Sequence, residues 1–177
     1  MREKTMEMNY CMQCGEKLRM KYHETEGRDI PWCESCRAFR YPVFNTAVSM
    51  IVLSRDGSRV ILIQQYGRPF YVLVAGYVNC GEDAEAAVAR EVREELGLTV
   101  ETLRFNRSHY FAPSNTLMLN FTAVVAEEEP RPNREVDQWA WFSVDEARAN
   151  IKPGSLAEAF LKGSFDGVYL FPERYGR

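Results

Sequence analysis

The chain has 177 residues, of which 46% are hydrophobic, so it can bury one substantial core and carry a small appendage. Its net charge of −3 and its pI of about 5.6 argue against nucleic acid or an anionic membrane as a partner. The first ten residues lack the apolar core of a signal peptide, and no apolar run is long enough to span a membrane. We therefore expect a soluble, cytoplasmic protein.

The first 42 residues carry four cysteines in two closely spaced pairs. Cys11 and Cys14 form one C-x2-C pair, and Cys33 and Cys36 form a second after eighteen intervening residues. This spacing is typical of a zinc ribbon, in which four thiolates hold a structural Zn²⁺ with no open coordination position. The alternatives are two disulfides, which the lack of a secretion signal disfavours, or four unlinked thiols. Metal binding would supply most of the folding energy of so short a segment.

Residues 43–82 alternate between strand and turn signals. Val43 to Leu53 is a mostly apolar, β-branched run, and Val60 to Ile63 resumes it after a turn signal at Arg55 to Ser58. The pair is predicted to form a hairpin. A further short strand, Tyr71 to Ala75, leads to Gly76, where a residue without a side chain lets the backbone approach a ligand closely.

The next stretch is predicted to be an amphipathic helix. Asp83 can cap its start, and Gly97 supplies a residue that readily adopts the left-handed conformation at its end. Val88, Val92 and Leu96 recur at four-residue steps, which gives an apolar seam for packing onto a sheet.

Three glutamates lie close together on this predicted helix. Glu91, Glu94 and Glu95 stand at positions i, i+3 and i+4, so their carboxylates are neighbours. Like charges so placed destabilise an isolated helix by roughly 0.2–0.5 kcal/mol per pair. A bound cation would turn that repulsion into a ligand set, and clustered carboxylate oxygens suit Mg²⁺ or Mn²⁺. A solvated, charged helix face is the alternative.

The remainder of the chain is predicted to add strands and two short helices. Ser143 and Glu146 form an S-x-x-E capping box for the first helix, and the second runs from Pro153 to about Lys162. The predicted strands are Val100–Phe105, Leu117–Val125 and Glu135–Phe142, with a loop over a pocket at Ser108–Thr116 and a solvated turn at Glu127–Pro130.

The string from Gly76 to Leu98 fills every fixed position of the Nudix box. These positions are a glycine, a glutamate after five residues, Arg-Glu after seven more, then an apolar residue, Glu-Glu after one residue, and a glycine after one more, followed by an apolar residue. A match at all of them by chance is very rare, so the chain resembles a Nudix hydrolase. The resemblance implies an α/β fold, namely an α/β/α sandwich with a mixed β-sheet. It also implies a Nudix hydrolase domain over residues 43–177, preceded by the small zinc ribbon of residues 1–42.

The resemblance further implies hydrolysis of a nucleoside diphosphate linked to another moiety, with Mg²⁺ or Mn²⁺ as the catalytic metal. The metal ligands it implies are Glu91, Glu95, the downstream Glu135 and the main-chain carbonyl of Ala75. Glu94 is a further ligand or the base that activates water. It also implies an ion pair between Glu82 and Arg90 that fixes the loop against the helix.

A zinc ribbon followed by a Nudix domain is similar to the NADH pyrophosphatase branch, and the likeness runs from about Tyr10 to Leu161. Glu135 stands six residues before Trp141, as does the downstream metal-binding glutamate of that branch. The branch fingerprint S-Q-P-W-P-F-P is replaced here by S-H-Y-F-A-P-S, which leaves the substrate open. Members also carry a large N-terminal domain, whereas ten residues precede Cys11 here.

The branch resemblance also suggests the substrate contacts. Tyr41 lies where the ribbon ends, and Ala157 lies in a late Pro-Gly-Ser-Leu-Ala segment. The matching residues of the branch touch substrate. Tyr110 and Phe111 could stack on a base, and His109 could hydrogen-bond a phosphate or ribose. The favoured substrate is an NAD(H)-like dinucleotide, cleaved to AMP and nicotinamide mononucleotide. ADP-ribose, a nucleoside diphosphate sugar, or a nucleotide-sensing role is the alternative, and the resemblance implies a homodimer.

Overall fold

The structure of the chain is a computed structural model that describes residues 8–126 and 129–166. The chain divides into two compact units. One holds the N-terminal segment up to Asn45 together with Ala112–Thr116, and the other holds Thr46–Phe111 and the chain from Leu117. Glu127 and Glu128 of the predicted acidic turn lie outside the described residues. Among the helices of the described ranges, none is both long enough and apolar enough to cross a membrane.

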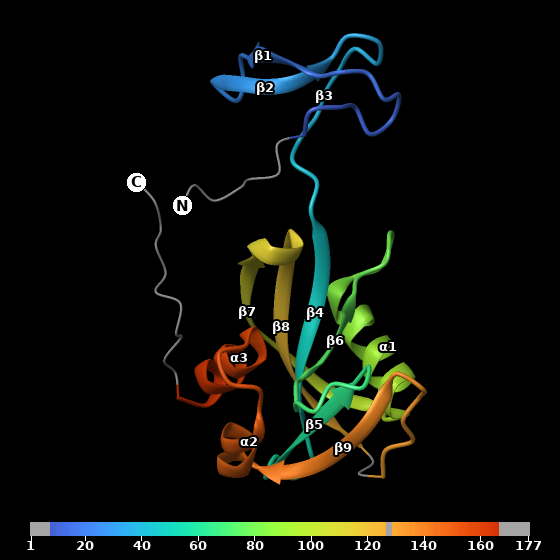
Figure 1. Cartoon of the computed structure of the whole chain (residues 1–177), viewed down its shortest axis with the longest axis vertical. Helices are drawn as coiled ribbons and strands as arrows, with labels where there is room; N and C mark the ends of the chain where they lie inside the picture. The colour runs from blue at the N-terminus through green and yellow to red at the C-terminus, as the bar shows by residue number, and fades with distance from the viewer. Residues whose placement is uncertain (1–7, 127–128, 167–177) are drawn as a thin grey trace. The chain divides into compact units, whose positions relative to one another are not determined.

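The first unit contains a small antiparallel sheet (Figure 1). Its strands are β1 (Arg19–His23), β2 (Arg28–Cys33) and β3 (Ala38–Phe39), in the order β1-β2-β3. Its apolar core is small: Cys11, Ile30 and Cys33 are the hydrophobic residues fully buried in it, among those the structure describes. With so little buried area, the unit depends on another source of folding energy, and a metal ion is one such source.

The second unit is built on a six-stranded sheet. The strand order is β7-β8-β4-β5-β9, and β6 pairs with β4 in antiparallel register. The strands are β4 (Asn45–Leu53), β5 (Arg59–Gln65), β6 (Val74–Tyr77), β7 (Val100–Phe111), β8 (Thr116–Val125) and β9 (Val136–Ser143).

Helices cover both faces of this sheet, as Figure 1 shows. Because side chains alternate along a strand, Val48, Met50 and Val52 of β4 pack with helix α1 (Ala84–Leu96), while Ile51 packs with helices α2 (Val144–Asn150) and α3 (Leu156–Asp166). The apolar seam of α1 predicted from the sequence lies buried against the first face. The predicted α/β/α sandwich is confirmed.

The helix ends agree with the sequence in position. Gly97 ends α1 with φ of 67°, and its N–H donates to the carbonyl of Arg93. Ser143 and Glu146 form both hydrogen bonds of a capping box at the start of α2. Asp83 occupies the N-cap of α1, but its side chain makes no capping hydrogen bond. Asp83 therefore lies at the predicted N-cap position, but the prediction that its side chain caps the helix is wrong.

The predicted loop over Ser108–Thr116 is wrong for most of its length. β7 continues to Phe111, and the connection to β8 consists of a single 3-10 turn, Ala112–Ser114, followed by Asn115 at φ of 50°. The polar and aromatic composition of the segment is typical of a loop, but pairing with β8 keeps its backbone extended. The turn itself is anchored by Asn115, whose side-chain amide donates to the carbonyl of Val43 at 3.0 Å.

Candidate active site and zinc centre

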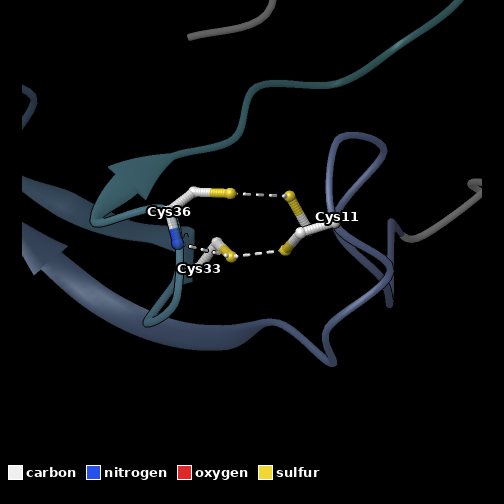
Figure 2. A group of neighbouring side chains, drawn as sticks. Cys11, Cys33 and Cys36 are labelled. Carbon is white, nitrogen blue, oxygen red and sulfur yellow. Dashed lines mark hydrogen bonds between the residues drawn. The ribbon is translucent and has the colours of Figure 1, made fainter.

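The four N-terminal cysteines converge in the first unit (Figure 2). Their sulfur atoms all lie within 4.8 Å of one another, and none is in a disulfide. Four sulfurs bonded tetrahedrally to one ion at about 2.3 Å would be about 3.8 Å apart. The observed Cys11–Cys36 and Cys14–Cys33 separations are 3.9 Å and 3.4 Å. The donor set and its spacing therefore fit a closed, structural zinc site.

The guanidinium of Arg40 adds positive charge beside this cluster. Its Nε donates to the sulfur of Cys11 at 3.2 Å, and this bond is the main reason that the pKa of Cys11 is lowered to about 6. Thiolates are the metal-binding form of cysteine, so Arg40 favours the protonation state that a metal ion requires.

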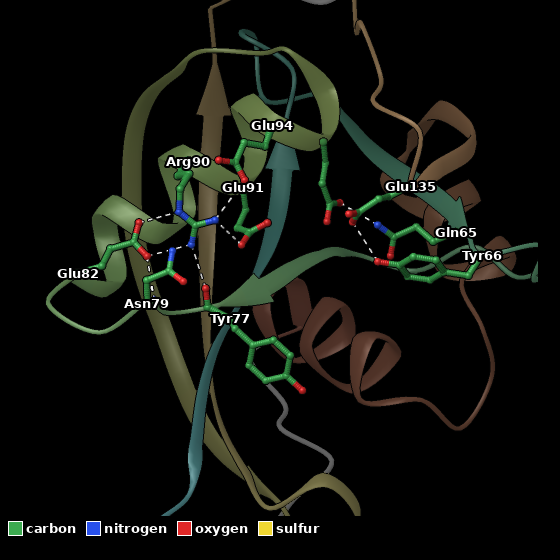
Figure 3. Close-up of polar contacts among 10 residues, drawn as sticks. Gln65, Tyr66, Tyr77, Asn79, Glu82, Arg90, Glu91, Glu94 and Glu135 are labelled. Carbon is green, nitrogen blue, oxygen red and sulfur yellow. Dashed lines mark hydrogen bonds and ion pairs between the residues drawn. The ribbon is translucent and has the colours of Figure 1, made fainter.

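In the second unit, Arg90 of α1 ties the loop before the helix to the helix itself (Figure 3). Its Nε and Nη2 donate to the two carboxylate oxygens of Glu82 at 2.7 Å and 2.9 Å. Its Nη2 also donates to the carbonyl of Tyr77, and its Nη1 donates to Glu91 at 2.7 Å. The ion pair with Arg90 is the main cause that lowers the pKa of Glu82 to about 2. The predicted pair between Glu82 and Arg90 is thus formed.

Gly76 lies directly against the carboxylate of Glu91. A Cβ atom at position 76 would be 2.0 Å from the Cδ of Glu91, so no other residue fits here without displacing that side chain. Gly76 and the preceding Ala75 belong to β6, where they pair with Val48 and Ser49 of β4. The sheet therefore brings the main chain around Ala75 to the carboxylate face of α1.

Glu95 is the most deeply buried carboxylate of the site, with 3% of its surface exposed. It accepts a hydrogen bond from Gln65 Nε2 at 2.9 Å. Burial is the main cause that raises its pKa to about 7, and the charges of Glu91, Glu135 and Glu94 raise it further. A nearby cation would stabilise the ionised form of this carboxylate, because it compensates for the lost hydration and for the repulsion from the neighbouring carboxylates.

Glu135 joins the site from the segment that enters β9. Its carboxylate accepts a hydrogen bond from the hydroxyl of Tyr66 at 2.9 Å. Its backbone N–H donates to the side chain of Asn133, whose own N–H donates to the carbonyl of Glu95 at 3.1 Å. Asn133 therefore connects the two glutamates through the backbone.

The carboxylates do not converge as tightly as the cysteines do. Within residues 8–126 and 129–166, the cysteine quartet is the one group of three or more potential ligands whose atoms all lie within 4.8 Å. Glu94 is 56% exposed at its side chain and lies 3.2 Å from Arg90 Nη1. The carboxylate oxygens are nevertheless the hard donors that Mg²⁺ or Mn²⁺ prefers. Among them, the hydrogen bond from Gln65 does not offset the effects of burial and of the neighbouring carboxylates on Glu95.

The predicted substrate contacts lie on different elements. His109, Tyr110 and Phe111 follow one another in β7, so Tyr110 points to the opposite face of the sheet from its two neighbours. His109 is half-buried, and its pKa is lowered by burial and then by the charge of Arg107. Ala157 of α3 packs against the apolar layer between the sheet and α2 and α3. Tyr41 belongs to the first unit, where it is 47% exposed.

Comparison with known protein families assigns the chain to one of them. The family described as NUDIX domain matches residues 43–160. The chain belongs to the Nudix family. Nudix enzymes use divalent metal ions, and the carboxylates on α1 and at Glu135, just before β9, offer the hard oxygen donors that such ions prefer.

Similar proteins lie in several bacteria. The chain is 28% identical over 167 residues to "NAD-capped RNA hydrolase NudC" of Vibrio atlanticus (strain LGP32), covering 93% of this chain and 60% of that protein. It is 34% identical over 139 residues to the protein of the same name in Pseudomonas aeruginosa (strain LESB58), covering 77% and 48%. The chain thus spans about half to three-fifths of the curated relatives it matches.

Solved structures show the same fold. A Nudix hydrolase from Nitrosomonas europaea superposes with a TM-score of 0.61 at 19% identity, covering 90% of this chain and 94% of that one. The Nudix domain of Shewanella oneidensis NrtR, complexed with ADP ribose, gives a TM-score of 0.56 at 15% identity, covering 74% and 88%. At these identities the likeness shows the Nudix fold alone.

Sequence reasoning missed Gln65 and Tyr66, which hold two of the Nudix glutamates. Gln65 is the last residue of β5 and Tyr66 follows it. The register with β9 shifts between Gln64 and Gln65, and Tyr66 has a φ of 57°. Irregular strand ends of this kind are common beside active sites. A polar Gln-Gln-Tyr-Gly run that ends an apolar strand was the available signal, although it does not name its partners.

Proposed function

We propose that this Nudix pyrophosphatase hydrolyses an NAD(H)-like dinucleotide to AMP and nicotinamide mononucleotide. The observation that carries the reaction is the buried, hydrogen-bonded Glu95, with Glu91 beside it on α1 and Glu135 added from the start of β9. The substrate assignment is supported by the NudC relatives, whose name refers to NAD-capped RNA.

In this proposal Glu91, Glu95, Glu135 and the carbonyl of Ala75 hold the divalent ion. When bound, Mg²⁺ or Mn²⁺ neutralises charge on the phosphate oxygens and orients the leaving group. Arg90 fixes Glu91 by a 2.7 Å bond, and the carboxylates keep their places because α1 and β9 are packed elements.

The remaining steps fall to water and a base. A water oxygen bonds to one phosphorus of the anhydride, the bond from that phosphorus to the bridging oxygen breaks, and the bridging oxygen leaves with the other phosphate. Glu94 either takes the proton of the water or serves as a further metal ligand. Its exposed carboxylate can reach solvent, which suits proton exchange.

The substrate would be held by the aromatic and polar residues assigned from the branch resemblance. Tyr41, Tyr110 and Phe111 offer rings for stacking, His109 a hydrogen bond, and Ala157 a small contact surface. We also propose that residues 1–42 form a zinc ribbon domain, that residues 43–177 form the Nudix hydrolase domain, and that the protein is a homodimer.

A second candidate substrate is ADP-ribose or a nucleoside diphosphate sugar. The observation that favours it is the altered segment Ser108–Ser114, in which the histidine and two aromatic residues replace most of the branch fingerprint. Because Tyr110 and Phe111 lie on opposite faces of β7, at most one of them can stack on a given base.

A substrate panel tests the proposal. The protein is incubated with Mg²⁺ or Mn²⁺ and NADH, NAD, ADP-ribose, a diadenosine polyphosphate, a nucleoside triphosphate and an NAD-capped RNA, and products are identified by mass. The proposal predicts AMP and nicotinamide mononucleotide from the NAD(H) species. Preferred release of AMP from ADP-ribose would replace it with the second candidate. Tight nucleotide binding without turnover would favour a nucleotide-sensing role.

A further inference from the structure

A cavity lies directly beside the proposed metal site. Gln65 and Tyr66 form part of its wall, and the same two side chains bond to Glu95 and Glu135 (Figure 3). Its volume is about 130 Å³, and it is lined by Gln65, Tyr66, Arg68, Phe70, Val72 and Lys152. A group bound in this cavity would therefore be a near neighbour of the reacting phosphates.

The charge of the cavity is opposite to that of the metal site. Arg68 and Lys152 both line it, and within the described ranges neither has a carboxylate oxygen within 4.0 Å. Lys152 instead places its Nζ 5.3 Å from the ring centroid of Phe70. Two cations without an acidic partner among the residues that the structure describes, beside an aromatic ring, are suited to an anionic ligand.

The backbone holds these cationic residues in place. The N–H of Lys152 donates to the carbonyl of Tyr71 at 2.9 Å, next to a parallel bridge between Tyr71 and Ile151. On the other side, the N–H of Gly67 donates to the carboxylate of Asp137 at 2.6 Å. The residues that flank Arg68 and Phe70 are thus fixed to β9 and to the connection between α2 and α3, which limits the ordering cost of binding.

The cavity has room for a small polar group. One water needs about 10–15 Å³ of such space, so a volume of about 130 Å³ has room for the oxygens of a phosphate group. Because Arg68 and Lys152 line it, an anion such as a phosphate is the ligand that the cavity favours.

We propose that this cavity binds a phosphate of the substrate that is additional to the scissile pyrophosphate, as on a phosphorylated ribose. The inference rests on the proposed function, since it concerns the same substrate. Arg68 and Lys152 are then specificity-determining residues. They favour substrates that carry the extra phosphate and leave the chemistry of the shared pyrophosphate unchanged.

The test compares substrates that differ only by that phosphate. The pairs are NADPH with NADH for a 2′-phosphate, and coenzyme A with dephospho-coenzyme A for a 3′-phosphate. In the Arg68→Ala/Lys152→Ala variant, kcat/KM for the phosphorylated member of at least one pair should fall about tenfold or more through KM, while kcat/KM for its partner stays within about twofold. Arg68→Lys should retain most of the preference, because the charge is kept.

Arg55→Ala is the matched control, because Arg55 is an exposed arginine of the same unit that lies 3.6 Å from Glu101 and does not line the cavity. For each pair, it should leave the ratio of kcat/KM between the phosphorylated substrate and its partner unchanged. The proposal is overturned if the double variant leaves the ratio of both pairs as in the wild type. It is also overturned if kcat/KM falls equally for both members of each pair, since the cavity would then bind the pyrophosphate itself.

A binding measurement distinguishes failure of the proposed function from failure of the cavity proposal. If the wild-type protein cleaves neither NADH nor NADPH, the binding of NADP⁺ and NAD⁺ is measured by calorimetry on the wild type and the double variant. A preference for NADP⁺ that the double variant loses supports the cavity without catalysis. Equal binding of NADP⁺ and NAD⁺ by the wild type, together with equal binding of coenzyme A and dephospho-coenzyme A, contradicts it.

Discussion

At the scale of single residues, Glu95 shows how burial and repulsion prepare a carboxylate for a cation. The group is 3% exposed, and its pKa is raised to about 7 from an ordinary value of 4.5. In the folded, metal-free protein it therefore binds a proton more tightly than in the unfolded chain. Between about pH 4.5 and pH 7 the folded state holds more protons, so stability must fall as pH rises through that window.

This sign gives a testable pH dependence. In metal-free protein, the free energy of unfolding should drop by about 3 kcal/mol, as an order of magnitude, between about pH 4 and pH 8 through this one group. Glu95→Gln should remove that slope, which denaturant titrations at several pH values would measure. An unchanged slope in the variant would show that Glu95 titrates normally.

Gln65 and Tyr66 are expected to position the glutamates they touch. Removing such an outer partner typically lowers metal affinity or activity by about 10- to 100-fold. We expect Tyr66→Phe, which loses the bond to Glu135, and Gln65→Leu, which loses the bond to Glu95, each to weaken Mn²⁺ binding to this extent. Direct Mn²⁺ titration measures this apart from turnover. Affinity equal to the wild type in both variants would leave these contacts without a role in the metal site.

At the scale of elements, the sequence predicts the features that depend on local interactions and misses those that depend on contacts between distant segments. Helix α1 was predicted with nearly correct ends because its cap positions, apolar seam and terminal glycine are all local. The length of β7 was missed because pairing with β8, and not local propensity, extends it.

The candidate site divides in the same way. The box carboxylates follow from a contiguous motif, whereas Tyr66 and Glu135 are separated by 69 positions along the chain. A contact of that range depends on the register of β5 with β9, which is irregular at Gln65. No spacing rule in the sequence encodes it.

Helix α2 offers a test of a local prediction that the structure confirms. Ser143 and Glu146 cap its first turn reciprocally. Ser143→Ala should lower the free energy of unfolding by about 1 kcal/mol, within a range of roughly 0.5–2 kcal/mol. Chemical denaturation of the wild type and the variant measures the change. A stability equal to the wild type would mean that the capping box contributes nothing in solution.

At the scale of the whole molecule, the two units are stabilised by different means. The Nudix unit has two apolar clusters on the two faces of its sheet, whereas the N-terminal unit has few buried residues and the cysteine quartet. If zinc provides most of the stability of the N-terminal unit, the two should unfold independently.

Metal removal should therefore act on one unit only. A zinc chelator, or Cys11→Ser, is expected to unfold the N-terminal unit while the Nudix unit keeps its thermal transition. Metal analysis and amide hydrogen exchange resolved along the chain would report both effects. Loss of protection throughout the sheet of the Nudix unit would contradict this division, and so would protein that contains no zinc as isolated.

The central claim is that the buried glutamate of α1 serves hydrolysis of the pyrophosphate in an NAD(H)-like dinucleotide. The most direct measurement follows NADH with Mn²⁺ by mass, using wild-type protein, Glu95→Gln and Glu94→Gln at equal concentration. The account predicts equal amounts of AMP and reduced nicotinamide mononucleotide from the wild type. It also predicts turnover lower by about 10²–10⁴ in each variant, with the fold retained. Wild-type turnover in both variants, or no AMP from the wild type, would contradict it.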